Sequence, residues 1–200
     1  MKCDIKKFFD NISHKILFDI IKNRIRDKDT LWLIELIIKS FKKEPNKGLP
    51  LGNVTSQLFA NIYLNEIDNF IKHNLKIKYY IRYCDDFLIL DSDKEKLKKL
   101  TPKIDNFLKN NLKLSLHPDK ITIRKYRQGI DFLGYISFPY HRTLRTKTKR
   151  RMFKRIKKKI LDLKQKKISE ESFNQTIQSY LGILKHCNSY KLRKKIIELL

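Results

Sequence analysis

Two aspartates stand side by side in the segment "YIRYCDDFLIL", residues 80–90, where apolar runs flank Asp85 and Asp86 on both sides. Adjacent carboxylates repel each other, and burying either one without a partner costs several kcal/mol of free energy. Two explanations are open: water solvates the pair at a turn, or a bound metal ion compensates its charge. Asp is frequent in turns for backbone reasons alone, so the pair by itself does not decide between them.

A third carboxylate, Asp4, stands in "KCDI", just before the chain turns toward a predicted helix. A nucleotidyl-transfer site needs carboxylates that hold two divalent ions about 3.5–4 Å apart, one activating the attacking hydroxyl and one steadying the leaving oxygen. The carboxylates of such sites commonly come from separate segments that converge at strand ends. Asp4, Asp85 and Asp86 are therefore the candidate residues for a two-metal site.

The elements that would position these carboxylates follow a mixed order of helices and strands. Strand-like runs on both sides of the aspartate pair predict a hairpin, and apolar residues at helical spacing predict helices before and after it. Ser13 is the expected N-cap of the first helix, and Ser92 with Glu95 forms a capping-box pattern. This order indicates an α+β fold rather than repeated βαβ units. The predicted helices cover about 13–26, 30–42, 55–73 and 93–111, and short strands are predicted near 113–116, 120–125 and 131–138.

The composition changes near residue 141. Residues 142–167 contain 14 Lys or Arg against a single acid, Asp162. Apolar residues recur at helical spacing inside this run, which predicts a basic helix that packs through a narrow apolar stripe and presents its cations outward. A solvated charge run is the alternative. Two further helices are predicted over about 169–186 and 189–200.

The chain as a whole contains 46 Lys and Arg against 21 Asp and Glu, a formal net charge of +25. Lys and Arg that bind phosphates release condensed counterions, so the expected partner is a polyanion. The alternative is the codon usage of an AT-rich genome, which raises the content of Lys, Ile and Asn everywhere. The uneven distribution of charge along the chain favours the polyanion.

Other features of the composition exclude further classes of protein. Hydrophobic residues at 41% and aromatic residues at 11% support a packed core, which excludes a disordered basic tail. No apolar run approaches the ~18 residues of a membrane span, so we expect no membrane partner. The N-terminal segment lacks the apolar region of a secretory signal. Three cysteines without paired spacing suit the reduced thiols of a cytosol, and a structural zinc site is not expected.

Four segments, in this order and at this spacing, resemble the palm of reverse transcriptases of the bacterial retroelement kind. They are "DIKKFF" at 4–9, "GLPLGNVTSQLFANIYLNEID" at 48–68, "YCDD" at 83–86 and "GIDFLGY" at 129–135. The resemblance extends through the rest of the chain, because "SYLGILKHCNSYKLRKKI" at 179–196 is similar to the thumb of these enzymes.

This resemblance implies an α+β fold with two parts. Residues 1–140 would form a polymerase palm, an antiparallel sheet with helices on one face, and residues 141–200 a small basic helical thumb. Family members carry a fingers region ahead of the Asp4 motif, and its basic residues hold the triphosphate of the incoming nucleotide. We therefore expect an incomplete reading frame or a degenerate copy, and weak activity of the chain in isolation.

The second motif differs from that of most relatives, which carry Gln-Gly-x-x-x-Ser-Pro. Here it reads "LGNVTSQ", with Leu51 in the Gln position and Gln57 in the Pro position. This pattern resembles the reverse transcriptases of diversity-generating retroelements, in which the aliphatic residue is associated with error-prone copying of template adenines. The resemblance therefore implies the same tendency for this chain.

The resemblance implies an RNA-directed DNA polymerase that adds deoxynucleotides to a primer 3′ end by two-metal-ion nucleotidyl transfer. It assigns catalysis to Asp4, Asp85 and Asp86, and it assigns two Mg²⁺ ions, with Mn²⁺ as a substitute, to these residues and Ile5. It assigns nucleotide binding to Phe9, Leu51, Gly52, Gln57 and Lys120. It assigns primer and template binding to Tyr83, Phe132, Leu133, Gly134, Lys149, Arg150, Arg151 and Lys154.

Two of these assignments compete with simpler explanations. Phe9 would lie under the sugar of the nucleotide and exclude a 2′-hydroxyl, but its residue type alone favours a core aromatic beside Phe8. Lys120 matches the region where relatives place a cation near the leaving pyrophosphate, but a surface lysine is the simpler interpretation. Both alternatives stay open at this point.

The partners implied are an RNA template, a DNA or RNA primer and deoxynucleoside triphosphates, in a bacterial or phage-encoded cytoplasmic protein. An accessory protein is left open. Two other functions are also left open: a truncated, non-catalytic remnant that binds RNA or DNA through its charge, and a reverse transcriptase recruited to antiviral defence.

Overall fold

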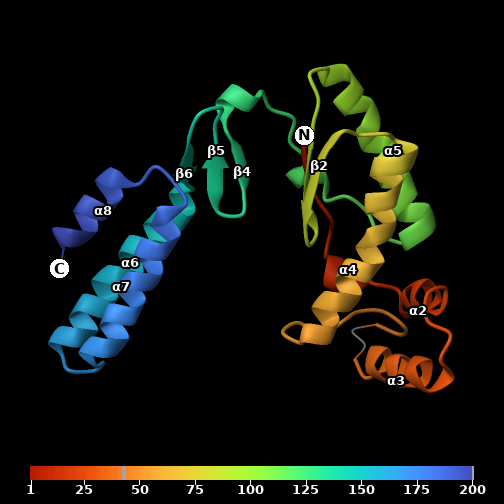
Figure 1. The fold of residues 1–200 in the computed structure, drawn as a ribbon, viewed down its shortest axis with the longest axis horizontal. Coiled ribbons are helices and arrows are strands. Elements are labelled where there is room, and N and C mark those ends of the chain that lie inside the picture. Colours follow the sequence, from red (N-terminus) through yellow and green to blue (C-terminus); the bar gives the residue numbers. More distant parts are fainter. Residues whose placement is uncertain (42–43, 200) are drawn as a thin grey trace. The chain divides into compact units, whose positions relative to one another are not determined.

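A computed structural model describes residues 1–41 and 44–199. The chain forms two compact units, Met1–Ile123 and Arg124–Leu200 (Figure 1). Both units combine an antiparallel sheet with helices, which confirms the predicted α+β class. Within the described residues, no helix is both long and apolar enough to cross a bilayer.

The sheet of the first unit contains β1 (Lys2–Asp4), β2 (Tyr79–Tyr83) and β3 (Asp86–Leu90), in the order β1-β3-β2. All pairings are antiparallel, so the predicted hairpin is confirmed as β2 and β3, while the N-terminal strand pairs with the other edge of β3. Met1 extends this pairing, because its ammonium group donates a hydrogen bond to the Ile89 carbonyl at 2.7 Å.

Helices cover one face of this sheet, and on the other face the side chains of β2 are exposed while Leu88 of β3 is buried. Buried side chains of α4 and α5 form one apolar core with Cys3, Phe87 and Ile89 of the strands. The alternate residues of β2, Tyr79, Ile81 and Tyr83, are exposed. The helices of the unit are α1 (Phe8–Asn11), α2 (His14–Lys22), α3 (Lys28–Lys39), α4 (Val54–Asn69), a π-helical turn η1 (Phe70–Asn74) and α5 (Lys94–Leu112).

The helix caps were partly predicted. The Ser13 side chain accepts a hydrogen bond from the Ile16 amide, so the predicted N-cap of α2 is confirmed. The Ser92 capping box is wrong, because the Asp93 carboxylate caps α5 instead and accepts from the Glu95 and Lys96 amides at 2.8 and 3.2 Å. The predicted helix ends at 42 and 200 lie outside the described residues.

The strands predicted at 113–116 and 120–125 are wrong. These segments form isolated bridges to β1 and its continuation, Ile5 with Leu116 and Lys2 with Thr122. A 3-10 turn, η2 (Pro118–Lys120), separates the two bridges and interrupts the pairing. The turn therefore lies beside β1, where it carries Lys120 to Asp4.

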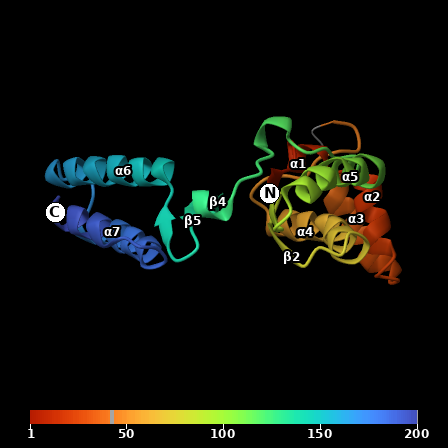
Figure 2. The ribbon, with the colours of Figure 1, turned by 90° about the horizontal axis from the view of Figure 1, so that it is seen from above.

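The second unit contains a three-stranded sheet and three helices. Its core joins Leu144 and Tyr135 of the strands to the apolar faces of the helices, and α6 and α7 run side by side (Figures 1 and 2). Because this packing binds the hairpin to the helices, the unit begins at Arg124, whereas we expected the division after residue 140. The elements are β4 (Ile130–Phe132), β5 (Tyr135–Ser137), β6 (Arg142–Leu144), α6 (Thr146–Lys164), α7 (Glu170–Lys185) and α8 (Tyr190–Ile197), after a 3-10 turn η3 (Tyr126–Gln128).

Tyr63 joins three parts of the first unit, and its loss should destabilise the chain. Its buried hydroxyl donates to the Leu112 carbonyl at 2.7 Å and accepts from the Ser13 amide at 3.4 Å, and burial raises the pKa of Tyr63 to about 12. Tyr63→Phe leaves that carbonyl unpaired, so we expect the free energy of unfolding in urea to fall by about 1–2 kcal/mol. Tyr140→Phe, at a side chain that is 98% exposed, is the control and should change nothing. Equal stability of the two variants would contradict this role.

Candidate active site at the β1–β3 ladder

The pairing of β1 with β3 brings the candidate carboxylates together. Asp4 lies opposite Asp86 in the antiparallel register. The Ile5 amide donates to the Asp85 carbonyl at 3.3 Å, just beyond the last paired residues. Four residues from two distant parts of the sequence, Asp4, Ile5, Asp85 and Asp86, therefore meet at one end of the sheet.

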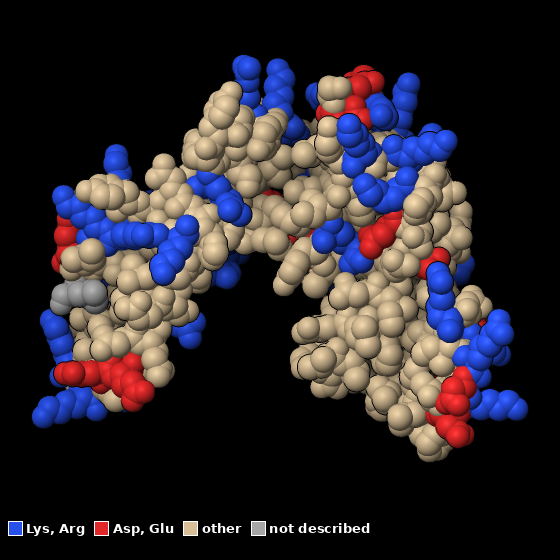
Figure 3. Space-filling model, viewed as in Figure 1, with Lys and Arg blue, Asp and Glu red and all other residues tan. Residues whose placement is uncertain are grey.

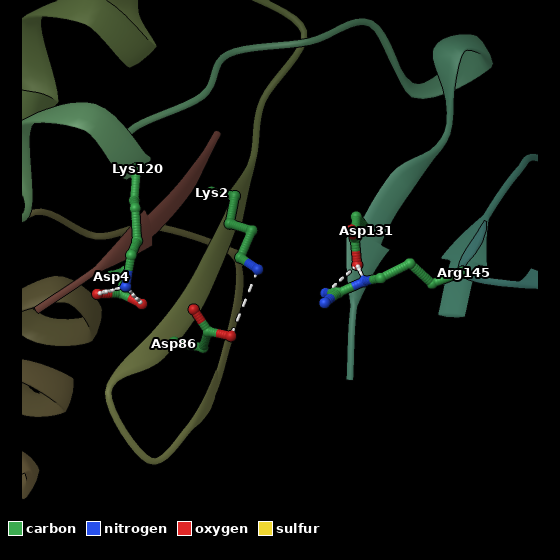
Figure 4. Close-up of polar contacts among 6 residues, drawn as sticks. All are labelled: Lys2, Asp4, Asp86, Lys120, Asp131 and Arg145. Atoms are coloured by element: carbon green, nitrogen blue, oxygen red, sulfur yellow. Dashed lines mark hydrogen bonds and ion pairs between the residues drawn. The ribbon is translucent and has the colours of Figure 1, made fainter. Parts of the chain in front are cut away.

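Two of the three carboxylates form ion pairs with lysines (Figure 4). Lys120 Nζ, on η2, lies 3.1 and 3.0 Å from the two carboxylate oxygens of Asp4. Lys2 Nζ, on β1, lies 3.3 Å from a carboxylate oxygen of Asp86. The two ammonium groups thus reduce the repulsion that three neighbouring carboxylates would otherwise experience.

Asp85 is the carboxylate with the least compensation. Burial raises the pKa of Asp85 above its ordinary value, and the charges of Asp4 and Asp86 raise it further. A hydrogen bond from its own backbone amide and the charge of Lys120 oppose this shift without cancelling it. A cation bound at this carboxylate would remove the penalty, because it would favour the ionised form.

The carboxylates suit a hard divalent ion by their chemistry, since Mg²⁺ prefers oxygen ligands. Their side chains are not arranged around a common point in this structure. Across residues 1–41 and 44–199, no three His, Cys, Asp or Glu side chains are grouped so that they could hold a metal ion. In this arrangement Asp4 and Asp86 form ion pairs with Lys120 and Lys2. The raised pKa of Asp85 marks the charge that such an ion would compensate.

The loop before α4 carries Leu51 and Gly52, two of the predicted nucleotide-binding residues. Backbone bonds hold it to the segment after Asp4, since the Gly48 amide donates to the Ile12 carbonyl and the Leu49 amide to the Phe9 carbonyl, both at 2.9 Å. Beyond these bonds Leu51 is 78% exposed, and Gly52 has a φ of +98° with open space where a Cβ would stand. Gln57, on the first turn of α4, is exposed as well.

Phe9 is packed as its residue type alone predicted. It lies edge-to-face against Phe8, with ring centroids 5.4 Å apart, and it contacts the core of the first unit. It is not fully buried, so part of the ring is accessible. Tyr83, the last residue of β2, is 59% exposed beside the aspartate turn.

The other predicted primer- and template-binding residues, from Phe132 onward, belong to the second unit, whereas the carboxylates belong to the first. Leu133 and Gly134 form the two-residue turn after Phe132, and both have positive φ, as hairpin turns of this length require. Asp131 accepts from Arg145 Nε at 2.7 Å, which ties β4 to the start of α6 (Figure 4). On α6, the predicted phosphate-binding residues Lys149, Arg150, Arg151 and Lys154 are exposed. Figure 3 shows Lys and Arg side chains projecting from the surface of both units.

Sequence reasoning missed two polar groups at this site. Lys2 precedes Asp4 by two residues, and because side chains alternate along a strand this spacing could have placed both on one face. Arg82, on β2, lies next to the aspartate turn and donates to the Cys84 carbonyl at 3.2 Å. Its other partners, Asn61 and Asp68, belong to α4, and no local sequence pattern predicts these contacts.

Comparisons with known proteins match most of the chain to one family. Residues 1–137 match the family described as "Reverse transcriptase (RNA-dependent DNA polymerase)". The chain is 27% identical over 170 residues to protein YkfC of Escherichia coli, covering 66% of this chain and 45% of that protein. It is 34% identical over 106 residues to the group II intron-encoded protein LtrA of Lactococcus lactis, covering 50% of this chain and 15% of that protein. The chain thus spans less than half of the length of these curated relatives.

A solved structure shows the same fold. Apo telomerase from Candida tropicalis, truncated from its C-terminal domain, superimposes with a TM-score of 0.50 at 19% identity, covering 68% of this chain and 32% of that one. At this identity the similarity concerns the fold alone. It agrees with the palm-like arrangement of an antiparallel sheet with helices on one face.

The raised pKa of Asp85 predicts a pH-dependent gain in stability for Asp85→Asn in buffer without divalent ions. Because the folded-state pKa lies above the ordinary 3.8, ionisation of Asp85 destabilises the fold as the pH rises above that value. A neutral amide removes this penalty, so we expect the melting temperature to rise by about 2–4 °C at neutral pH, and by nothing at a pH below the ordinary pKa. Thermal unfolding followed by circular dichroism measures both.

Asp91→Asn is the matched control for this experiment. The Asp91 carboxylate accepts from Lys96, and this bond lowers the pKa of Asp91, so its replacement should not stabilise the chain at neutral pH. A stabilisation by Asp85→Asn that persists at acid pH, or none at neutral pH, would contradict the uncompensated charge of Asp85.

Proposed function

Because the chain belongs to the reverse transcriptase family, we propose that it carries the active site of an RNA-directed DNA polymerase. The observation that carries this proposal is the meeting of Asp4, Asp85 and Asp86 at one end of the β1–β3 ladder, inside the part that matches the family. In the proposed reaction the 3′ oxygen of a primer attacks the α-phosphorus of a deoxynucleoside triphosphate. A new P–O bond forms, the bond to the β-phosphate oxygen breaks, and pyrophosphate leaves.

The chain's own residues would divide the work of this reaction. Asp4, Asp85, Asp86 and Ile5 would hold two Mg²⁺ ions, or Mn²⁺ in their place, which would supply activation of the primer hydroxyl and neutralisation of the phosphates. Lys120, whose ammonium group lies 3.0 Å from a carboxylate oxygen of Asp4, would neutralise the leaving pyrophosphate.

The nucleic acids and the nucleotide would contact the exposed residues around the carboxylates. Phe9 would lie under the sugar and exclude a 2′-hydroxyl, while Leu51, Gly52 and Gln57 would contact the base pair. Tyr83 would lie near the primer end. The first unit would thereby act as the palm.

The second unit would supply the primer grip and the thumb. The turn at 132–134 would contact the primer, and the exposed cations of α6 would bind phosphates of an RNA template and its DNA or RNA primer, contacts that carry no sequence information. Several cations on one helix fit this role, because each phosphate that they neutralise releases counterions and so strengthens binding.

Primer extension with matched variants tests the proposal. With an RNA template, a DNA primer, deoxynucleoside triphosphates and Mg²⁺, we expect slow extension that Asp85→Asn lowers by more than about 1000-fold, because it removes a group needed only for the chemistry. Asp91→Asn removes one negative charge in the same way, but Asp91 lies beyond the end of β3. This variant should therefore extend primers as the parent chain does. Extension that survives in Asp85→Asn would contradict the proposal.

The lysine pairs favour a second candidate, a remnant that binds nucleic acid without catalysis, because they satisfy Asp4 and Asp86 without metal. RNA binding at several salt concentrations, measured beside primer extension, separates the two functions. A remnant would bind RNA with strong salt dependence, indifferent to Mg²⁺ and to an Asp4→Asn/Asp85→Asn double change. Metal-dependent extension lost in that double variant would exclude it.

The exposed Leu51 supports a narrower proposal, a reverse transcriptase of the diversity-generating type that miscopies template adenines. A leucine can contact a base pair but offers no hydrogen bond, so discrimination should be weaker by on the order of tenfold. Leu51→Gln is therefore expected to lower misincorporation opposite adenine by about tenfold in the extension assay, measured by sequencing the products.

Leu33→Gln is the control for this change, since Leu33 is 52% exposed and belongs to α3 rather than to the loop that carries Leu51. It should leave the error spectrum unchanged. An error rate opposite adenine that Leu51→Gln does not alter would contradict the narrower proposal while leaving polymerase activity itself untouched.

A further inference from the structure

A polar network fastens the aspartate turn to helix α4. The Arg82 guanidinium donates to both carboxylate oxygens of Asp68, from Nε at 2.8 Å and from Nη2 at 2.5 Å. Its Nη1 donates to the Asn61 side-chain oxygen and to the Cys84 carbonyl, each at 3.2 Å. The Tyr80 hydroxyl donates to the same Asp68 carboxylate at 2.6 Å. One arginine thus joins β2, α4 and the turn between β2 and β3.

The turn that Arg82 contacts needs external support. Cys84 has a φ of +52°, a left-handed conformation that costs a residue with a Cβ about 1–2 kcal/mol. The Cys84 carbonyl belongs to the peptide group directly before Asp85, so the hydrogen bond from Arg82 fixes the orientation of that peptide. The direction of the Asp85 side chain depends on it.

The charge pair gives this contact a rigid base. The Arg82 side chain is 11% exposed and that of Asp68 is 28% exposed. Burial acts to lower the pKa of Arg82, but the hydrogen bonds and charge of Asp68 outweigh it and raise that pKa, so the guanidinium stays charged. Its planar fork serves Asp68 and still leaves Nη1 for the turn, an arrangement that the single ammonium group of lysine cannot reproduce.

We propose that Arg82 is a positioning residue that fixes the Cys84–Asp85 peptide against helix α4 and so sets the position of the Asp85 carboxylate. This inference rests on the proposed function. The same helix follows directly on the loop that carries Leu51 and Gly52, so Arg82 also links that loop to the carboxylates through Asn61 and Asp68.

Arg82→Lys tests the inference, with Mn²⁺ as the probe. We expect the affinity for Mn²⁺, measured from the free-ion signal in electron paramagnetic resonance, to fall by about 10-fold or more, as for other groups that orient metal ligands. Hydrogen exchange at the amides of residues 84–86 should become faster. The double change Arg82→Met/Asp68→Asn should behave alike, and it leaves no unpaired charge to unfold the chain.

Lys72→Met is the matched control. Lys72 Nζ donates to the carbonyls of Ile77 and Lys78, at 3.4 and 3.1 Å, and so supports the other end of β2. Lys72→Met should lower the melting temperature by weakening the sheet, without acting on the turn before Asp85. We expect Lys72→Met to keep both the Mn²⁺ affinity and the slow exchange of the turn.

The outcomes separate the inference from the proposed function. Parent-like Mn²⁺ affinity and exchange in Arg82→Lys would overturn the positioning role while leaving the polymerase proposal intact. Mn²⁺ binding that Asp85→Asn does not weaken would instead contradict the proposed function. Exchange at residues 84–86 would then still decide the role of Arg82: faster exchange supports it, and unchanged exchange overturns it.

Discussion

Antiparallel pairing of β1 with β3 is the interaction on which the candidate site depends. It alone brings Asp4, near the start of the chain, opposite Asp86, and it places the buried Cys3 opposite the buried Phe87. A register shift of one residue would turn Asp4 toward the core and Cys3 toward solvent, because side chains alternate along a strand. The core therefore specifies the register, and the register specifies the site.

The second constraint is electrostatic. Three neighbouring carboxylates at one end of the sheet repel one another, and two lysines reduce this repulsion by pairing with Asp4 and Asp86. Asp85 receives no such ion pair among the described residues, and its raised pKa reflects the remaining penalty. If metal ions bind these carboxylates, they would have to replace the ammonium groups of Lys2 and Lys120.

The sequence predicted what local patterns determine. The α+β order, the hairpin around the aspartates and the Ser13 cap all follow from spacing within a few residues. The cap of α5 is also local, because Asp93 accepts from amides two and three residues later, and the prediction of Ser92 is wrong by one residue. Other missed features depend on tertiary packing. Leu144 joins the core of the second unit from inside a basic run, and Arg82 finds partners on a helix that precedes it in the chain. Such pairings arise only when distant elements meet.

We propose that the carboxylates of Asp4, Asp85 and Asp86 bind divalent ions when Lys2 and Lys120 move away from them. Anomalous X-ray scattering from crystals of the chain grown with Mn²⁺ tests this most directly. We expect anomalous peaks in contact with the carboxylates of Asp4 and Asp85, with the Lys120 ammonium group displaced from Asp4. Saturating Mn²⁺ that gives no peak at these carboxylates, with Lys120 still paired to Asp4, would contradict it.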